Sequence, residues 1–248
     1  SIYMYGWFLA EPSAPNPMMA KWGSDIPFVL QHNARLWQPE TQPNFETSMH
    51  ALYLGCRLAW DPTIQPKDVF NELHTRFYGH AGKEMAAYWQ FIDNVWVNTP
   101  EYSGCGFGHM QRWTPEKLAA AHKLLDTANT ACRTYVERRR VQLAADSLDL
   151  FDLFMKLRRD QAEGRFANLA ADADYWRKRI RFLGEKYKTQ SCFTLMPWSP
   201  VTLSGGYFAQ FYQKSYDEES RVAKEFQILT PQPLREFRYQ AAEDKSGE

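Results

Sequence analysis

LWQPET, residues 36–41, is a short apolar run that stops at a proline and a glutamate. Leu36 and Trp37 have the character of a buried strand, whereas Glu40 places a carboxylate where that strand ends. The next segment, residues 45–60, carries apolar side chains at helical spacing. We therefore predict a strand over residues 34–39, with Leu36 and Trp37 inside, that passes into a helix with Glu40 at the junction.

A similar order precedes this stretch. IYMYGWFL, residues 2–9, is rich in aromatic and branched side chains and predicts a buried strand. The three prolines of AEPSAPNPMM then indicate a loop. A helix is predicted over residues 18–33, although Pro27 argues against its first part. Strand, helix, strand and helix in this order are typical of parallel β/α units.

The character of the chain changes at Asp61, where we place a domain boundary. Residues 66–188 predict helices, with a stop at Gly79 and a start at Thr114, which can cap a helix that begins at Pro115. Apolar side chains recur there in steps of three and four. These seams are Leu118, Ala121, Leu125, Ala128 and Cys132; Ala144, Leu148, Phe151 and Met155; and Leu169, Ala173, Trp176, Ile180, Leu183 and Tyr187.

The predicted fold is therefore mainly α with a small α/β part. Residues 1–61 would form the last β/α units of a (β/α)8 barrel, and residues 62–190 an antiparallel helical bundle. Residues 191–248 are irregular and β-like, and would either pack on the barrel or lead to a further domain. The chain opens on an apolar strand without a leader and closes on a polar stretch, so we expect an internal piece of a longer protein.

Composition narrows the possible functions. Lys plus Arg and Asp plus Glu both number 29, so the net charge is zero and does not attract the chain to nucleic acid or acidic membranes. No apolar run approaches the roughly 20 residues of a membrane span. The four cysteines form no Cys-x-x-Cys pair, and the histidines lack metal spacing, so we predict no metal and no cofactor. Aromatic residues make up 15%, which favours a large helical core over exposed sugar-stacking rings by roughly two to one.

The predicted strand ends carry the candidate chemistry. In a β/α barrel the functional groups lie at the carboxyl ends of the strands, which here offer Tyr5, Trp7, Trp37 and Glu40. A carboxylate beside an indole suits carbohydrate, because the acid accepts hydrogen bonds from hydroxyls while the ring stacks. A cap or surface ion pair at Glu40 is about equally supported. The glycine-rich loop 98–113 adds His109 as a residue that could cover a groove, although an ordinary interhelical turn is somewhat favoured.

Glycoside hydrolysis requires two carboxyl groups about 5 to 9.5 Å apart. Glu40 could be one of them, and Glu11 and Glu46 are the available partners, but no convincing pair stands out. The catalytic residues are therefore left unassigned. The sequence shows no zinc motif, no nucleophile elbow and no dinucleotide fingerprint.

Several segments together resemble a family of large bacterial proteins with a domain of unknown function, related to glycoside hydrolases near the α-glucuronidases and β-hexosaminidases. The matching pieces are Glu40 after its strand, LAWDP at 58–62, RFYG at 76–79 and TPEKL at 114–118, within residues 1–185. REFRYQAAEDKSGE, near the end, resembles the run-up to a β-sandwich carbohydrate-binding module.

The resemblance implies the last two strands of a TIM barrel and a helical domain in a secreted or periplasmic protein that degrades polysaccharide. Catalytic acids would come mainly from other strands of the barrel, against which this chain would pack. We expect a fragment of a glycoside hydrolase acting on polysaccharide or oligosaccharide, with substrate contacts from Tyr5, Trp7, Trp37, Glu40 and His109. The alternative is a noncatalytic carbohydrate-binding or structural helical domain.

Overall fold

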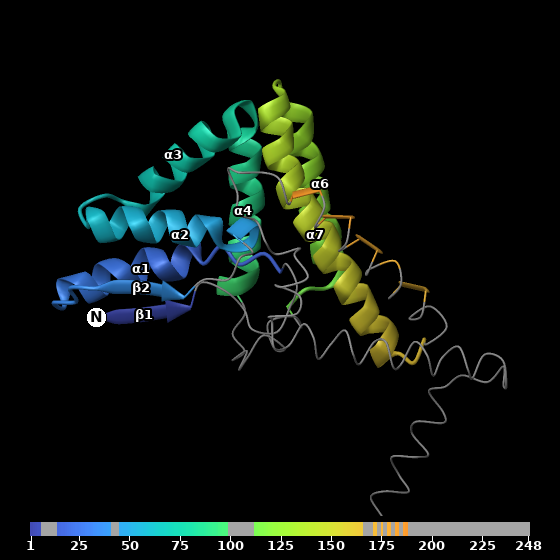
Figure 1. The fold of residues 1–248 in the computed structure, drawn as a ribbon, viewed down its shortest axis with the longest axis horizontal. Helices are drawn as coiled ribbons and strands as arrows, with labels where there is room; N and C mark the ends of the chain where they lie inside the picture. The colour runs from blue at the N-terminus through green and yellow to red at the C-terminus, as the bar shows by residue number, and fades with distance from the viewer. Residues whose placement is uncertain are drawn as a thin grey trace, which may run out of the picture.

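Two short parallel strands pair at one end of a chain that is otherwise mainly helical (Figure 1). The computed structural model describes residues 1–5, 14–40, 45–98 and 112–165, and within the next segment residues 171–172, 175, 178–179, 182–183 and 186–187. The predicted tail, residues 191–248, lies outside these ranges. Within the described residues, the prediction of a mainly helical fold with a small parallel β/α part is confirmed.

The strands follow the predicted order. β1 (Ile2–Tyr5) leads to helix α1 (Met19–Gln31), and β2 (Trp37–Glu40) leads to helix α2 (Phe45–Trp60). The strands are parallel, and their register pairs Ile2 with Trp37 and Tyr5 with Glu40. Both carboxyl ends therefore lie at the same edge of the sheet.

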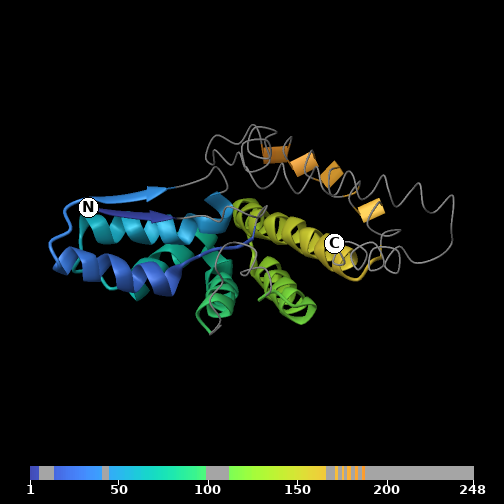
Figure 2. The same ribbon diagram turned by 90° about the horizontal axis from the view of Figure 1, so that it is seen from below.

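Helices cover one face of this sheet. Met4 of β1 and Trp37 of β2 pack with Trp22 and Ile26 of α1 and Leu54 of α2 in one apolar cluster. Figure 2 shows α1 and α2 on one side of the strands and no described helix on the other. Tyr3, which alternates with Met4, is 51% exposed.

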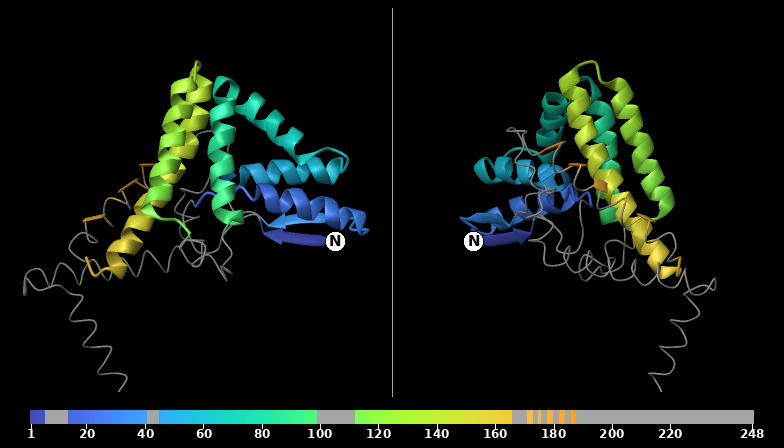
Figure 3. Two further views of the ribbon diagram at one scale, coloured as in Figure 1. Left: turned by 180° about the vertical axis from the view of Figure 1, so that it is seen from behind. Right: turned by 45° about the vertical axis from the view of Figure 1, so that its right-hand side comes forward.

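The helical region packs around a larger apolar core. It comprises α3 (Pro66–Tyr78), the 3-10 turn η1 (Gly79–Ala81), α4 (Gly82–Val97), α6 (Pro115–Ala131) and α7 (Tyr135–Ala162). Figure 3 shows α4, α6 and α7 side by side, with α3 running from α2 to α4. The predicted seams on α6 and α7 are all buried: Leu118, Ala121, Leu125, Ala128, Cys132, Ala144, Leu148, Phe151 and Met155.

The predicted helix ends are confirmed where the structure describes them. The backbone N–H of Lys117 donates to Thr114 Oγ1 at 3.3 Å, so the threonine caps α6. Gly79 ends α3 with φ +58°, a conformation that side chains with a Cβ seldom adopt. Of the predicted seam after residue 165, Leu183 and Tyr187 are described and both are buried.

The two apolar cores interlock across the boundary predicted near Asp61. Val69 of α3 belongs to the cluster beneath the sheet, whereas Met19 of α1 and the preceding Ala14 belong to the core of the helical region. Packing therefore joins the two parts through side chains as well as through the chain itself.

A buried carboxylate adds a polar link between the two parts. Asp93 of α4 accepts hydrogen bonds from the backbone N–H of Met19 at 2.8 Å and of Ala20 at 3.0 Å. These two groups open α1, whose own N-cap residue, Met18, has a left-handed backbone and supplies no side-chain bond. Burial raises the pKa of Asp93, and the two backbone hydrogen bonds oppose that rise.

Two expectations about individual residues are wrong. Helix α1 runs without a break through Pro27, because burial of Trp22 and Ile26 on either side of the lost hydrogen bond outweighs its absence. Leu36 is 56% exposed, because it precedes β2 and is not covered by α1 or α2. The expected inward position of Trp37 is confirmed, because Trp37 packs toward α1 and α2.

The buried face of α2 differs from the face that helical spacing predicts. The spacing predicts a face of Met49, Leu52, Tyr53, Cys56 and Trp60, yet Trp60 is 91% exposed. The face that packs against α1 and the sheet instead carries Ala51, Leu54 and Leu58. Gly55, which lies on the same side and has no side chain, allows α2 to approach Trp37 closely.

We expect Gly55→Ala to destabilise the protein by about 1–3 kcal/mol, the usual range for overpacking a core. A Cβ at Gly55 would lie 2.3 Å from Trp37 Cζ2. The matched control is Gly23→Ala in α1, where the added Cβ would meet Pro66 at an ordinary 3.4 Å. Urea denaturation should show a neutral or slightly stabilising effect for the control, and equal midpoints for the two variants would contradict the packing described.

We expect Asp93→Asn to lower the free energy of unfolding by about 1–3 kcal/mol, because the amide replaces one of two acceptors with a donor that faces a backbone N–H. Thermal and urea denaturation would measure the loss. The control is Asp126→Asn on the exposed side of α6, which should change stability by less than about 0.5 kcal/mol. Equal stabilities of the two variants would show that the link is dispensable.

Candidate functional site

The carboxyl edge of the sheet brings two of the predicted site residues together. Tyr5 and Glu40 end β1 and β2 and are partners in the strand register. Trp7 and His109 lie outside the described residues, so nothing connects them to this edge.

Trp37 takes a different position. It begins β2, at the opposite end of the strand from Glu40. Its indole packs edge-to-face on Trp22, with ring centroids 5.5 Å apart, and lies against Gly55. This contact uses the ring as core between sheet and helices, and Trp37 is therefore removed from the candidate sugar contacts.

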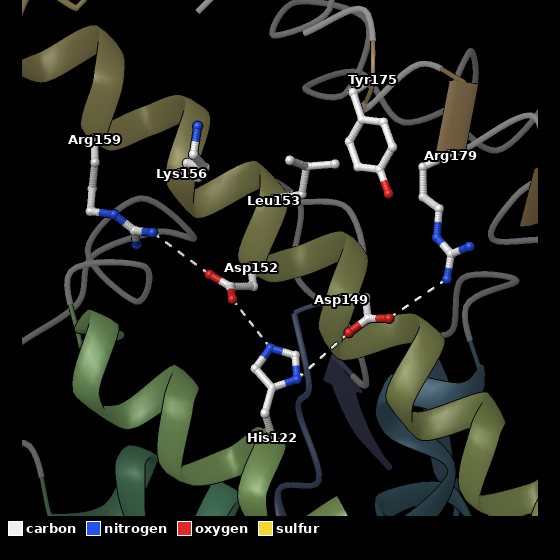
Figure 4. Close-up of a pocket in the computed structure, with 8 residues that line it drawn as sticks. All are labelled: His122, Asp149, Asp152, Leu153, Lys156, Arg159, Tyr175 and Arg179. Atoms are coloured by element: carbon white, nitrogen blue, oxygen red, sulfur yellow. Dashed lines mark hydrogen bonds and ion pairs between the residues drawn. The ribbon is translucent and has the colours of Figure 1, made fainter. Parts of the chain in front are cut away.

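A pocket of about 470 Å³ lies elsewhere, between α6, α7 and the segment that contains residues 175 and 179 (Figure 4). It is lined by His122, Asp149, Asp152, Leu153, Lys156, Arg159, Tyr175 and Arg179. The α7 residues follow helical spacing, so they project from one side of the helix, beside the apolar seam that faces the core. Most of the described residues that line the pocket carry charged side chains.

His122 stands between two carboxylates at the base of this pocket. Its Nε2 lies 3.2 Å from Asp152 Oδ2, and its Nδ1 lies 3.6 Å from Asp149 Oδ1. The hydrogen bond to Asp152 raises the pKa of His122 against the effect of burial, and the nearby carboxylates add to the rise. The same bond lowers the pKa of Asp152, whereas desolvation raises the pKa of Asp149.

Arginines extend this network on both sides. Arg159 reaches Asp152 with an N–O separation of 3.6 Å, and Arg179 reaches Asp149 at the same separation (Figure 4). Arg179 also donates to the buried carboxylate of Asp146 at 2.9 Å. The pocket therefore has opposite charges arranged alternately around its wall.

The charged side chains of the pocket are held by ion pairs. The described residues contain no cluster of three or more His, Cys, Asp or Glu that could hold a metal ion. We therefore assign no nucleophile and no metal here.

A pair of histidines, separate from the pocket, is buried in the core. His50 and His74 bring their Nε2 atoms within 3.1 Å of each other, beside Trp89. Burial, and to a lesser extent His74, lowers the pKa of His50 well below its usual value, and burial lowers the pKa of His74 to about 4. Both rings are therefore neutral near pH 7, and both are buried in the core.

The cysteines that the structure describes are free. Cys56 is exposed on α2, and Cys132 is buried at the end of α6. Cys105 and Cys192 lie outside the described residues.

Sequence reasoning missed the pocket. His122 has no metal-spaced partner along the chain, and its two carboxylates follow it by 27 and 30 residues, a separation that only the packing of α6 on α7 closes. A usable signal was the row Asp149, Asp152 and Lys156 at helical spacing beside the apolar seam of α7.

Comparison of the chain with protein-family models, with curated proteins and with solved structures finds no match in any of the three. Within the described part of the chain, no helix combines the length and apolar character that crossing a bilayer requires.

We expect His122→Gln to alter the pH dependence of stability. Because the pKa of His122 is raised in the folded protein, its contribution is complete below an unfolded pKa of about 6.5 and is lost as pH rises through the folded value. Urea denaturation from pH 5.5 to 9 should show a wild-type advantage of less than about 1 kcal/mol at the acid end that shrinks toward the alkaline end.

His32→Gln, an exposed position on the end of α1, serves as the control. A difference between wild type and His122→Gln that stays constant with pH would contradict the assignment. Subtracting the free energy of unfolding of His122→Gln from that of wild type also cancels the pH effect of the buried His50 and His74 pair, which both proteins share.

Proposed function

We propose that this chain forms two β/α units and a helical domain of a glycoside hydrolase-like protein that acts on polysaccharide or oligosaccharide. In this proposal the carboxyl ends of β1 and β2 contribute substrate contacts at the rim of a barrel. The observation that carries it is the parallel register, which sets Tyr5 opposite Glu40 at one edge.

The uncovered face of the sheet supports this proposal. Tyr3, half exposed, and Gln38, exposed, are register partners on the side opposite the helices. Inside a (β/α)8 barrel, side chains of neighbouring strands fill that side, and further strands pair with both edges. The two described strands also have no described neighbour at their outer edges, where further strands of a larger sheet would pair.

The helical region has a structural part in the proposal. Helices α3, α4, α6 and α7 would form the antiparallel bundle that braces the barrel, and Asp93 would hold α1 to it. Polysaccharides are degraded mainly outside the cytoplasm, so we place the protein in the periplasm or among secreted proteins.

A noncatalytic carbohydrate-binding or structural helical domain is the second candidate. The predominance of helix in the described chain favours it, and the described strand ends provide a single carboxylate residue, Glu40, where hydrolysis would need two. The two candidates differ in one observable, because only the first predicts hydrolysis.

The test is hydrolysis of a panel of aryl glycosides by a protein that contains this chain within a complete barrel. If Glu40 contacts substrate, Glu40→Gln should lower kcat/KM by roughly 10- to 100-fold, the loss of a charged hydrogen bond to the sugar. Glu116→Gln, in the first turn of α6, is the matched control and should retain full activity. Full activity of Glu40→Gln would remove Glu40 from the site, and saccharide binding without hydrolysis would favour the second candidate.

A further inference from the structure

Asp149 is a carboxylate with charged neighbours and no hydrogen bond from the described residues. Its oxygens lie 3.6 Å from His122 Nδ1 and 3.6 Å from Arg179 Nη2. Hydrogen bonds between nitrogen and oxygen require about 2.7–3.2 Å, so these contacts neutralise charge without using the lone pairs of Asp149. The carboxylate is 46% exposed and forms part of the pocket wall.

The opposite side of the pocket has unused donor capacity. Arg159 lines the pocket, and its Nη2 lies 3.6 Å from Asp152 Oδ1, too far for a hydrogen bond. Asp149 and Arg159 are thus an acceptor and a donor beside the same pocket, each too far from its ionic neighbours for a hydrogen bond, whereas His122 and Asp152 are bonded at 3.2 Å. A hydroxyl group both donates and accepts, so it can complete hydrogen bonds to a carboxylate and to a guanidinium at once.

The pocket also offers apolar surface. Leu153 lies on its α7 wall, and Tyr175 faces it from the other side (Figure 4). Tyr175 is 58% exposed, so its ring is accessible. An exposed aromatic ring beside groups that bind hydroxyls matches the two chemical faces of a pyranose, the C–H face and the hydroxyl edge.

We propose that the pocket between α6 and α7 binds a neutral sugar residue, whose hydroxyls bridge Asp149 and the arginines while its C–H face lies on Tyr175. Charged ligands fit less well. An anion would meet two carboxylates, and a cation would meet Lys156 and two arginines. This site is separate from the barrel rim and does not depend on hydrolytic activity.

The test measures binding of neutral tetrasaccharides to the full chain by calorimetry, using maltotetraose, cellotetraose, xylotetraose and mannotetraose. Tyr175→Ala should weaken binding about three- to tenfold, as expected for loss of an aromatic contact. Tyr135→Ala is the matched control, because Tyr135 is 68% exposed at the start of α7 and packs with Arg139. That variant should bind as wild type does.

Asp149→Asn provides a second variant that preserves the shape of the side chain. The amide keeps one acceptor oxygen but loses the charge that holds His122 and Arg179. Saccharide binding should therefore weaken by about the same factor as in Tyr175→Ala. Circular dichroism and melting temperature would verify that both variants fold.

Unchanged affinity in both Tyr175→Ala and Asp149→Asn would overturn the proposal. So would a failure to bind any neutral tetrasaccharide, or binding confined to tetragalacturonate, an anionic probe. Glu40→Gln separates the two sites. If Glu40→Gln loses saccharide binding while Tyr175→Ala keeps it, the rim is favoured and the pocket is excluded. The absence of hydrolysis would count against the rim proposal alone.

Discussion

The arrangement of this chain depends on how α4 meets the start of α1. The first N–H groups of a helix have no partner within it, and Met18, the residue before α1, provides none from its side chain. Asp93 supplies the missing acceptor from 73 residues away. Its negative charge also lies where the helix dipole favours an anion. This contact holds the β/α layer in place against the helical region, despite the cost of burying a carboxylate.

The sheet in turn depends on its contact with α1 and α2. The edge-to-face pair of Trp22 and Trp37, together with the absence of a side chain at Gly55, lets α2 approach the strands closely. That fit gives Trp37 a packing role and leaves Tyr5 and Glu40 as the described candidates at the carboxyl edge. Core packing and proposed substrate contact are thus divided between the two ends of the same short strand.

Helix α7 carries both structure and proposed function on adjoining sides. Its apolar seam closes the core against α6, while its polar row meets His122 and Arg179 around the pocket. The ion pairs there connect α6, α7 and the segment around residue 179, so they stabilise the packing of these elements. The 3.6 Å separations around Asp149 leave its hydrogen-bonding capacity for the proposed ligand.

The order of parallel β/α units, the helical seams of α6 and α7 and the cap at Thr114 could be predicted from the amino-acid sequence, because they depend on periodicity and on local backbone chemistry. The buried face of α2, the exposure of Leu36 and the grouping around His122 could not. They follow from the way the elements pack against one another. Periodicity tells how side chains repeat along one element but not which neighbour that element meets, and residues distant in the chain become a site only when helices pack.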